Sequence, residues 1–235
     1  MTHKAELSNT RMLQLVAEKL GRLREKVVFL GGAVIPFLIT EPDVPMTRFT
    51  KDIDIIFRYE NREELYEFED GLRDSGFKKK FNGAVCQWEV DGVHIDVFPT
   101  DPEVITRFIG NHWWAEAEQS AITADIGNGL IINIIPGHCF VGVKLCAFMM
   151  RGKRDYLMSY DINDIILIIA GRAEIEQEVL VRASPQLRKF IIGELKNIYS
   201  AVKDNPASTL QTLNDDMFPK QLASKALARI QQMIA

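Results

Sequence analysis

Two aspartates alternate with isoleucines in the segment Asp52-Ile53-Asp54-Ile55. Side chains of a strand alternate between its two faces, so both carboxylates point one way while the isoleucines point into a core. Neighbouring carboxylates repel each other and lose hydration when they are buried. A hard divalent cation such as Mg²⁺ removes that cost, because it prefers oxygen ligands and keeps coordination positions for substrate phosphates. The pattern is typical of a phosphoryl- or nucleotidyl-transfer site.

A solvated pair of aspartates on an edge strand would show the same short pattern, and a D-x-D triplet alone more often means that. Three neighbouring features favour a site. The strand continues as Ile55-Ile56-Phe57, which is typical of a buried strand. Gly31-Gly32 follows the apolar strand Val27 to Leu30, and backbone N–H groups at a turn that opens a helix bind phosphate oxygens. A third acid, Asp96, alternates with apolar residues in Val93 to Phe98.

Apolar periodicity and turn residues predict the elements that must position these side chains. An amphipathic helix is expected from Leu7 to Leu23, and another from Asn61, whose side chain caps it, to Ser75. Asp91-Gly92 is a strong hairpin signal, which places the strand of Asp96 inside the sheet and close to the strand of Asp52. The expected strands are 27–30, the segment with Asp52 and Asp54, 77–81, 85–90, 93–98, 122–126 and 130–135, the last two joined by Gly127-Asn128-Gly129.

The chain changes character at Pro136, because from there to Ala235 the apolar period is helical. The expected fold is α+β, with an N-terminal mixed β-sheet flanked by helices in residues 1–135 and a C-terminal helical bundle in residues 136–235. A length of 235 residues fits one large domain or two small ones.

The composition is that of an ordinary soluble protein, with 47% hydrophobic and 26% charged residues. A formal net charge of −4 argues against a nucleic-acid binder covered in positive charge, while it permits a local basic groove. The three cysteines form neither a metal-binding cluster nor a disulfide framework, which favours a reducing cytoplasm. The polar N-terminus and the short, interrupted apolar runs argue against a signal segment and a membrane span. We expect a soluble, cytoplasmic protein.

A lysine lies within an apolar helical stretch, Val141 to Phe148, in the second half of the chain. Such a lysine, here Lys144, usually carries its charge to solvent and has a structural role. A dense alternation of basic and acidic residues follows at 151–165, which favours a role in a site instead. Asp161 and Asp164 are three residues apart, so one helix face can present both.

In this order, Gly31-Gly32, Asp52-Ile53-Asp54 and Asp96 resemble the signature of the DNA polymerase β-like nucleotidyltransferase superfamily. The spacing Arg48-x-Thr50-x-Asp52 and the helical lysine followed by late acids resemble its AbiEii/AbiGii toxin-type branch. The resemblance extends from about Val27 to Arg172. It implies a catalytic nucleotidyltransferase domain at 1–135 and a helical domain at 136–235 that completes the nucleotide site.

The resemblance also implies residue roles. The metal ligands and catalytic acids would be Asp52, Asp54 and Asp96. The nucleotide-binding residues would be Gly31, Gly32, Arg48, Thr50 and Lys144. One further catalytic acid would come from the second half of the chain, and Asp155, Asp161 and Asp164 compete for that role.

The implied activity is transfer of a nucleoside monophosphate, with Mg²⁺, from a nucleoside triphosphate such as ATP to an acceptor hydroxyl on RNA, tRNA or protein. The branch includes toxins of toxin–antitoxin and phage-defence systems, so an antitoxin protein is a candidate partner, and no membrane is expected. Two alternatives stay open, a small-molecule (antibiotic-type) nucleotidyltransferase and an inactive nucleotide-binding relative. The basic segments Lys78 to Lys80 and Arg151 to Arg154 favour an open groove over a compact acidic pocket.

Overall fold

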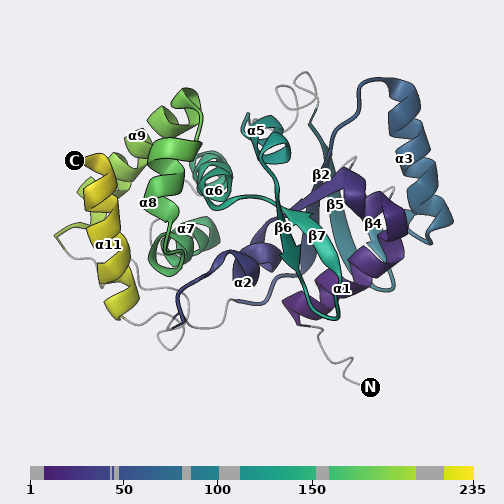
Figure 1. Cartoon of the computed structure of the whole chain (residues 1–235), viewed down its shortest axis with the longest axis horizontal. Helices are drawn as coiled ribbons and strands as arrows, with labels where there is room; N and C mark the ends of the chain where they lie inside the picture. The colour runs from purple at the N-terminus through teal and green to yellow at the C-terminus, as the bar shows by residue number, and fades with distance from the viewer. Residues whose placement is uncertain are drawn as a thin grey trace. The chain divides into compact units, whose positions relative to one another are not determined.

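The chain forms one unit built on a β-sheet and a second unit whose described elements are helices. The computed structural model describes residues 8–42, 44, 48–80, 86–100, 112–151, 159–204 and 220–235. The first unit comprises Met1–Val34 and Arg48–Ile135, and the second comprises Ile35–Thr47 and Pro136–Ala235. Figure 1 labels the elements of both.

The sheet of the first unit has seven strands in the order β3-β4-β5-β2-β1-β7-β6 (Figure 1). The strands are β1 Val27–Leu30, β2 Asp52–Phe57, β3 Lys78–Lys79, β4 Gln87–Val90, β5 Val93–Pro99, β6 Ile122–Asp125 and β7 Ile131–Ile134. β2 pairs in parallel with β5 and β1 in parallel with β7, while the other neighbours are antiparallel. The predicted α+β fold with a mixed sheet is confirmed.

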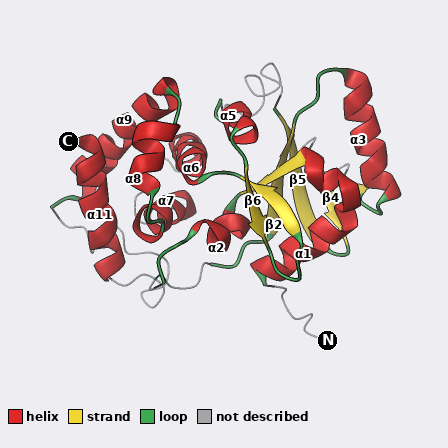
Figure 2. Cartoon of the chain, viewed as in Figure 1, coloured by secondary structure: helices red, strands yellow, loops and turns green. Residues whose placement is uncertain are grey.

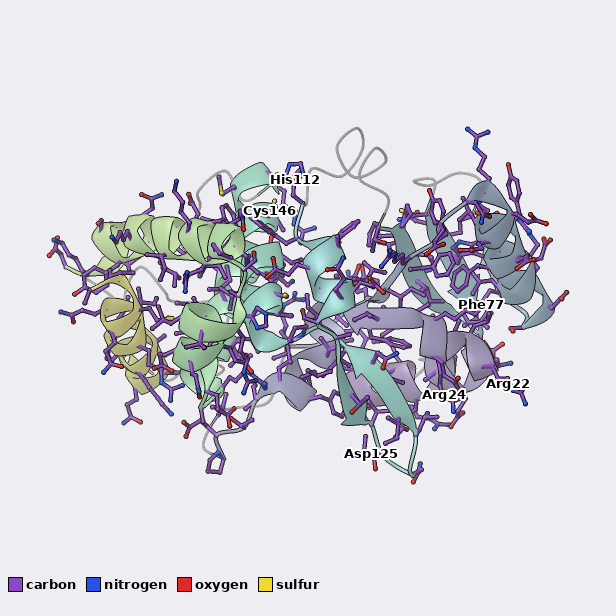
Figure 3. The ribbon with its side chains drawn as sticks, turned by 45° about the horizontal axis from the view of Figure 1, so that its top comes forward. Arg22, Arg24, Phe77, His112, Asp125 and Cys146 are labelled. Atoms are coloured by element: carbon purple, nitrogen blue, oxygen red, sulfur yellow. The ribbon has the colours of Figure 1, made fainter. Side chains whose placement is uncertain are left out.

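Two hairpin turns set the order of the outer strands. Asp91 and Gly92 have φ values of 47° and 82°, which a tight two-residue turn between twisted strands requires. Gly127 to Gly129 likewise have positive φ. The Asp125 carboxylate accepts a hydrogen bond from the N–H of Gly127 and closes that turn (Figure 3). Both hairpins expected from the sequence are therefore present.

Helices cover the sheet of the first unit (Figure 2). They are α1 Asn9–Leu20, the 3₁₀ segments η1 Gly21–Lys26 and η2 Gly32–Val34, α3 Arg62–Asp74 and α5 Trp114–Gln119. Asn61 caps α3 as predicted. The helix expected to reach Leu23 ends at Leu20, because Gly21 takes φ 54° and breaks the α-helical path. Phe68 of α3 stacks on Phe57 with ring centroids 3.8 Å apart, which fixes α3 to the sheet.

The second unit is arranged around one buried helix. Its elements are α2 Ile35–Leu38, α6 Gly137–Arg151, α7 Tyr160–Gly171, α8 Ile175–Gln177, the π-helical turn η4 Glu178–Arg182, α9 Pro185–Val202 and α11 Lys220–Ile234. All residues of α7 from Asp161 to Gly171 are buried, including the polar Asp161, Asn163 and Asp164 near its start. α6 and α11 pack against it. Among the described residues, no helix combines the length and apolarity that crossing a bilayer requires.

A buried ion pair joins the end of α7 to η4. Arg172 Nη2 and Nε donate to the two carboxylate oxygens of Glu178 at 2.7 and 2.9 Å, and Nη1 donates to the Leu38 carbonyl at 2.8 Å. A β-carbon on Gly137 would lie 2.4 Å from Glu178 Oε2 and 2.6 Å from Arg172 Nε. A larger residue at the first position of α6 would therefore displace the Arg172–Glu178 pair.

We expect Glu178→Ala to lower the free energy of unfolding by about 3–5 kcal/mol, because it leaves the buried Arg172 guanidinium without its counter-charge. Arg182 is the matched control, since it also contacts Glu178 but its side chain is 58% exposed. Arg182→Ala should cost less than about 1 kcal/mol. Urea denaturation of both variants measures the difference, and equal costs would contradict the interpretation.

Candidate active site

The acids predicted from the sequence meet on one face of the sheet. Asp52 and Asp54 are half-buried on β2, while the alternating Ile53 and Ile55 are completely buried. The parallel register of β2 and β5 places Asp54 directly beside Asp96. Residues paired in register point to the same face, so three carboxylates from two neighbouring strands share one surface.

The pKa of the Asp96 carboxyl is shifted by its surroundings on this surface. Burial raises the pKa of the Asp96 carboxyl, and the negative charge of Asp52 raises it further. Gln87, opposite Asp96 in the β4–β5 register, lowers the pKa through a side-chain hydrogen bond, as do the charges of His94 and Lys80. The net shift is upward. The acids therefore crowd one another, which is a condition that a bound cation would relieve.

The two glycines after β1 differ in whether a side chain could be accommodated. Gly31 has φ +77°, and a β-carbon there would lie 1.9 Å from Asp54 Oδ2. The Asp54 carboxyl thus packs against the backbone of the turn, and only glycine fits. At Gly32 a β-carbon would meet Arg48 Nη2 at 3.4 Å and Thr50 Cβ at 3.5 Å, which are ordinary contacts. Gly32 therefore lies beside Arg48 and Thr50, and a small side chain such as that of alanine would fit at this position.

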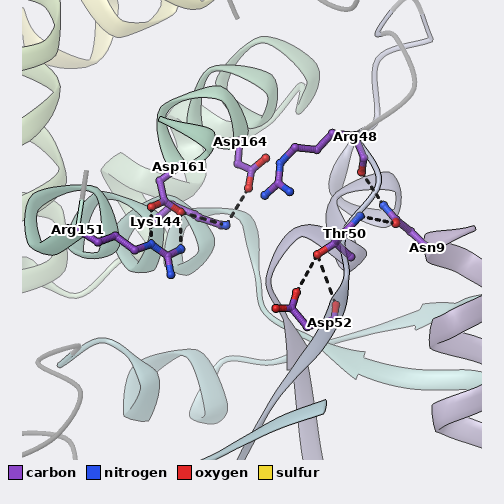
Figure 4. A network of polar contacts seen from close by, with 8 residues as sticks. All are labelled: Asn9, Arg48, Thr50, Asp52, Lys144, Arg151, Asp161 and Asp164. Carbon is purple, nitrogen blue, oxygen red and sulfur yellow. Dashed lines mark hydrogen bonds and ion pairs between the residues drawn. The ribbon is translucent and has the colours of Figure 1, made fainter. Parts of the chain in front are cut away.

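A short polar network connects the segment before β2 to helix α1 (Figure 4). The buried Thr50 donates from Oγ1 to Asp52 Oδ1 at 2.9 Å, and its backbone N–H donates to Asn9 Oδ1 at 3.0 Å. Asn9 Nδ2 in turn donates to the Arg48 carbonyl at 2.9 Å. Sequence analysis missed Asn9, because Ser8-Asn9-Thr10 reads only as a run of helix-capping residues.

A second charged cluster lies inside the helical unit. Lys144 Nζ of α6 is 3.3 Å from Asp161 Oδ1 and 2.7 Å from Asp164 Oδ2 of α7, and all three side chains are buried. Arg151 donates to both oxygens of Asp161 (Figure 4). The spacing argument that Asp161 and Asp164 share a helix face is thus confirmed. Asp155, the third competing acid, lies outside the described residues together with Lys153 and Arg154.

Paired charges keep Asp161 ionised. Burial by itself raises the pKa of the Asp161 carboxyl, but hydrogen bonds and charge from Arg151 and Lys144 outweigh it and hold the pKa below its ordinary value. The cluster balances two carboxylates against two cations. Its residues therefore stabilise one another within the helical unit, and their predicted roles toward a nucleotide stay predictions.

The basic segment at 78–80 is engaged by acids of the same unit. Lys79 pairs with Glu69, and Lys80 contacts Glu89 at 3.2 Å and His94 at 2.7 Å. Lys79 and Lys80 therefore each have an acidic partner within the first unit.

The chemistry of the three sheet acids suits magnesium. Asp52, Asp54 and Asp96 offer carboxylate oxygens, which hard divalent cations prefer over nitrogen or sulfur. Thr50 already orients one oxygen of Asp52. In this conformation the three do not present one oxygen each within 4.8 Å of the other two. The residues therefore fit the ion by donor type and by their common sheet face rather than by a preformed cage.

Known proteins resemble this chain in fold rather than in sequence. No protein-family model and no curated protein sequence matches the chain. The crystal structure of an antigenic nucleotidyltransferase-like protein from Paracoccidioides brasiliensis matches with a TM-score of 0.52 and 19% identity, over 90% of this chain and 96% of that one. The chain has a nucleotidyltransferase-like fold.

Two further solved structures match with lower TM-scores. The solution structure of the antibiotic-resistance factor ANT(2'')-Ia gives a TM-score of 0.44 with 14% identity, over 83% of this chain and 95% of that one. The CdnE cyclic dinucleotide synthase of Elizabethkingia meningoseptica gives 0.26 with 16% identity, over 95% of this chain and 88% of that one.

Alanine substitution should separate the two glycines of the turn. Gly31→Ala should lower the free energy of unfolding by at least about 1–2 kcal/mol, because the residue has positive φ and faces the Asp54 carboxyl. Gly32→Ala should change it by less than about 1 kcal/mol, because ordinary space is available. Chemical denaturation measures both. Equal destabilisation of the two variants would show that the turn is not built as described.

The shifted pKa of Asp96 predicts a pH dependence of stability. Because the folded-state pKa lies above the ordinary value of 3.8, the folded chain binds more protons than the unfolded chain between the two values. The contribution of Asp96 to stability therefore falls as pH rises through that window. Asp96→Asn should gain stability relative to the wild type from pH 3.8 toward neutrality in magnesium-free buffer. A relative loss over that range, measured by denaturation at a series of pH values, would contradict the assignment.

Proposed function

We propose that the chain is a magnesium-dependent nucleotidyltransferase, which moves a nucleoside monophosphate from a nucleoside triphosphate to an acceptor hydroxyl and releases pyrophosphate. The observation that carries the proposal is the register that pairs Asp54 with Asp96, with Asp52 on the same face. The glycine turn against Asp54 and the nucleotidyltransferase-like fold support it.

In the proposed site, Asp52, Asp54 and Asp96 hold the cation. A bound divalent ion supplies charge that stabilises the entering and leaving oxygens of an in-line displacement at phosphorus. The protein's own task is positioning and charge neutralisation, since phosphoryl-group transfer asks little covalent chemistry of it. Thr50 serves this task by fixing the orientation of the Asp52 carboxylate.

The triphosphate would lie beside the glycine turn. Arg48 reaches the space next to Gly32, where its guanidinium offers several donors and a permanent positive charge to phosphate oxygens. Arg48, Thr50 and the turn thus form the nucleotide side of the proposed site, and the acids form the metal side.

Asp96 would act through the cation that it helps to hold, because a nearby divalent cation lowers the pKa of the acceptor hydroxyl. Gln87 faces Asp96 across the β4–β5 pair and holds the carboxyl by a hydrogen bond. As the oxygen–hydrogen bond of the acceptor breaks and its proton passes to solvent, the acceptor oxygen bonds to the α-phosphorus, and the bond between that phosphorus and the departing pyrophosphate breaks.

The role of the helical unit stays a prediction. Lys144 is ion-paired with Asp161 and Asp164, so a contact between its ammonium group and a triphosphate would require it to exchange these partners. The acceptor (RNA, tRNA or protein) and a toxin function with a partner antitoxin also rest on the sequence resemblance. Labelling with nucleoside triphosphates in a cell extract would identify the acceptor directly.

Asp52→Asn and Asp54→Asn should each reduce nucleotidyl transfer by at least about a hundredfold, the scale of loss when a preorganised electrostatic group is removed. Neither should unfold the domain, because each substitution relieves repulsion between neighbouring carboxylates. Asp70→Asn, on an exposed position of α3, is the matched acidic control and should keep wild-type transfer. Near-normal turnover of Asp52→Asn or Asp54→Asn with magnesium would show that the metal assignment is wrong.

The activity can be tested without knowing the acceptor. The purified chain is incubated with a cell extract, Mg²⁺ and each of the four α-labelled nucleoside triphosphates in turn. Labelled RNA or labelled protein, absent with Asp52→Asn or with a chelator, is the expected result. A labelled small molecule would favour the antibiotic-type alternative. Absence of any magnesium-dependent label would favour the inactive relative.

A further inference from the structure

Asn9, at the start of α1, contacts the segment that carries two of the proposed site residues. Its side-chain amide donates to the Arg48 carbonyl at 2.9 Å and its side-chain oxygen accepts from the Thr50 N–H at 3.0 Å. We propose that Asn9 is a positioning residue, which holds Arg48 and Thr50 in the geometry needed to bind a magnesium-complexed nucleotide. This inference rests on the function proposed above.

The segment that Asn9 holds has no regular secondary structure. Residues 48–50 precede β2 and belong to neither a helix nor a strand, so no strand ladder fixes their backbone. The two hydrogen bonds of the Asn9 side chain span 39 and 41 residues of sequence, and the residue is 7% exposed. A side chain of α1 thus does for this segment what backbone pairing does for a strand.

The side chains of Arg48 and Thr50 reach the two parts of the proposed site, the phosphate side and the metal side. Arg48 Nη2 comes within 3.4 Å of the position of a β-carbon on Gly32, at the phosphate side. Thr50 Oγ1 donates to Asp52 Oδ1, at the metal side. A shift of this backbone would move the guanidinium and the hydroxyl together, and it would release the oriented Asp52 oxygen.

Helix capping does not account for Asn9. Ser8 is the N-cap of α1, and its hydroxyl oxygen accepts from the Arg11 N–H. Asn9 is one residue further into the helix, where its side chain is free to reach outward to residues 48 and 50. The contact also suits an amide, which carries a donor nitrogen and an acceptor oxygen on the same carbon and so serves both partners at once.

The experiment compares Asn9→Ala and Asn9→Asp with Gln14→Ala. Aspartate keeps the acceptor for Thr50 N–H but loses the donor to the Arg48 carbonyl, so it removes half of the contact with little change in volume. Gln14 is the matched control, because it lies on the same helix and also donates to a distant backbone carbonyl, that of Ile126 at 2.7 Å. Unfolding temperatures verify that all three variants are folded.

The readout is the affinity for a nucleoside triphosphate measured by calorimetry with and without Mg²⁺, using whichever of ATP, GTP, CTP and UTP the wild type binds best. We expect both Asn9 variants to weaken magnesium-dependent binding by about tenfold or more, and Gln14→Ala to stay within about twofold. Wild-type affinity in both Asn9 variants would overturn the inference, provided that Asp52→Asn has lost binding. Unchanged binding in Asp52→Asn would instead overturn the proposed function.

Coupling between Asn9 and Thr50 separates positioning from general stability. Thr50→Val removes the hydroxyl at nearly constant volume, and Thr50→Ser restores it. If Asn9 acts through Thr50, Asn9→Ala should weaken nucleotide binding less in the Thr50→Val background than in the wild type, whereas Gln14→Ala and Thr50→Val should be additive. Additive effects of Asn9→Ala and Thr50→Val on nucleotide affinity would show that Asn9 does not act through this residue.

Hydrogen exchange gives a readout that does not require nucleotide. Asn9→Ala should increase exchange at the Thr50 amide, because its acceptor is removed, while Gln14→Ala should not. Unchanged exchange at Thr50 in a folded Asn9→Ala variant would overturn the positioning role, whatever the activity of the protein proves to be.

Discussion

The structure of the first unit depends on keeping three like charges together on one face of a sheet. Their repulsion is overcome by the opposite face of the same strands, where Ile53, Ile55 and Ile95 are completely buried. A slip of one residue between β2 and β5 would turn the isoleucines outward and the acids into the core. The apolar core therefore fixes the register that sets Asp54 beside Asp96, and crowded carboxylates are retained because the packing behind them leaves no better register.

Several contacts fix the positions of the Asp52 and Asp54 carboxyl groups. Gly31 lets the Asp54 carboxyl lie against the turn, and the Thr50 hydroxyl holds an oxygen of Asp52. Asn9 secures the irregular segment that brings Thr50 there. These contacts join residues from α1, the turn after β1 and the start of β2, so the site is built by tertiary packing around a rigid strand pair. Such preorganisation is what electrostatic catalysis of phosphoryl-group transfer requires.

In the helical unit, the buried charges of the described residues are paired with charges of opposite sign. Lys144 and Arg151 balance Asp161 and Asp164, and Arg172 is paired bidentately with Glu178, so each buried charge has an opposite partner. Buried pairs add little net stability over apolar packing, but they are costly to break singly and they favour one arrangement of helices. The sheet acids lie beside acids of like sign, although the charges of His94 and Lys80 also act on Asp96. This crowding of like charge is why we propose the sheet acids, rather than the helical cluster, for cation binding.

The sequence alone determined the features that depend on neighbouring residues: the alternation that puts Asp52 and Asp54 on one face, the Asp91-Gly92 hairpin, the Asn61 cap and the shared helix face of Asp161 and Asp164. The same hairpin also predicted that the strand of Asp96 lies close to the strand of Asp52. Only the tertiary structure decided that Asp54 and Asp96 are paired in register, that Asn9 holds residues 48 and 50, that Gly31 faces Asp54, and that Lys144 is paired within its own unit. Periodicity and turn chemistry are local properties and leave a local pattern. Contacts between residues some 40 positions apart leave no local pattern, because they depend on how the whole core packs.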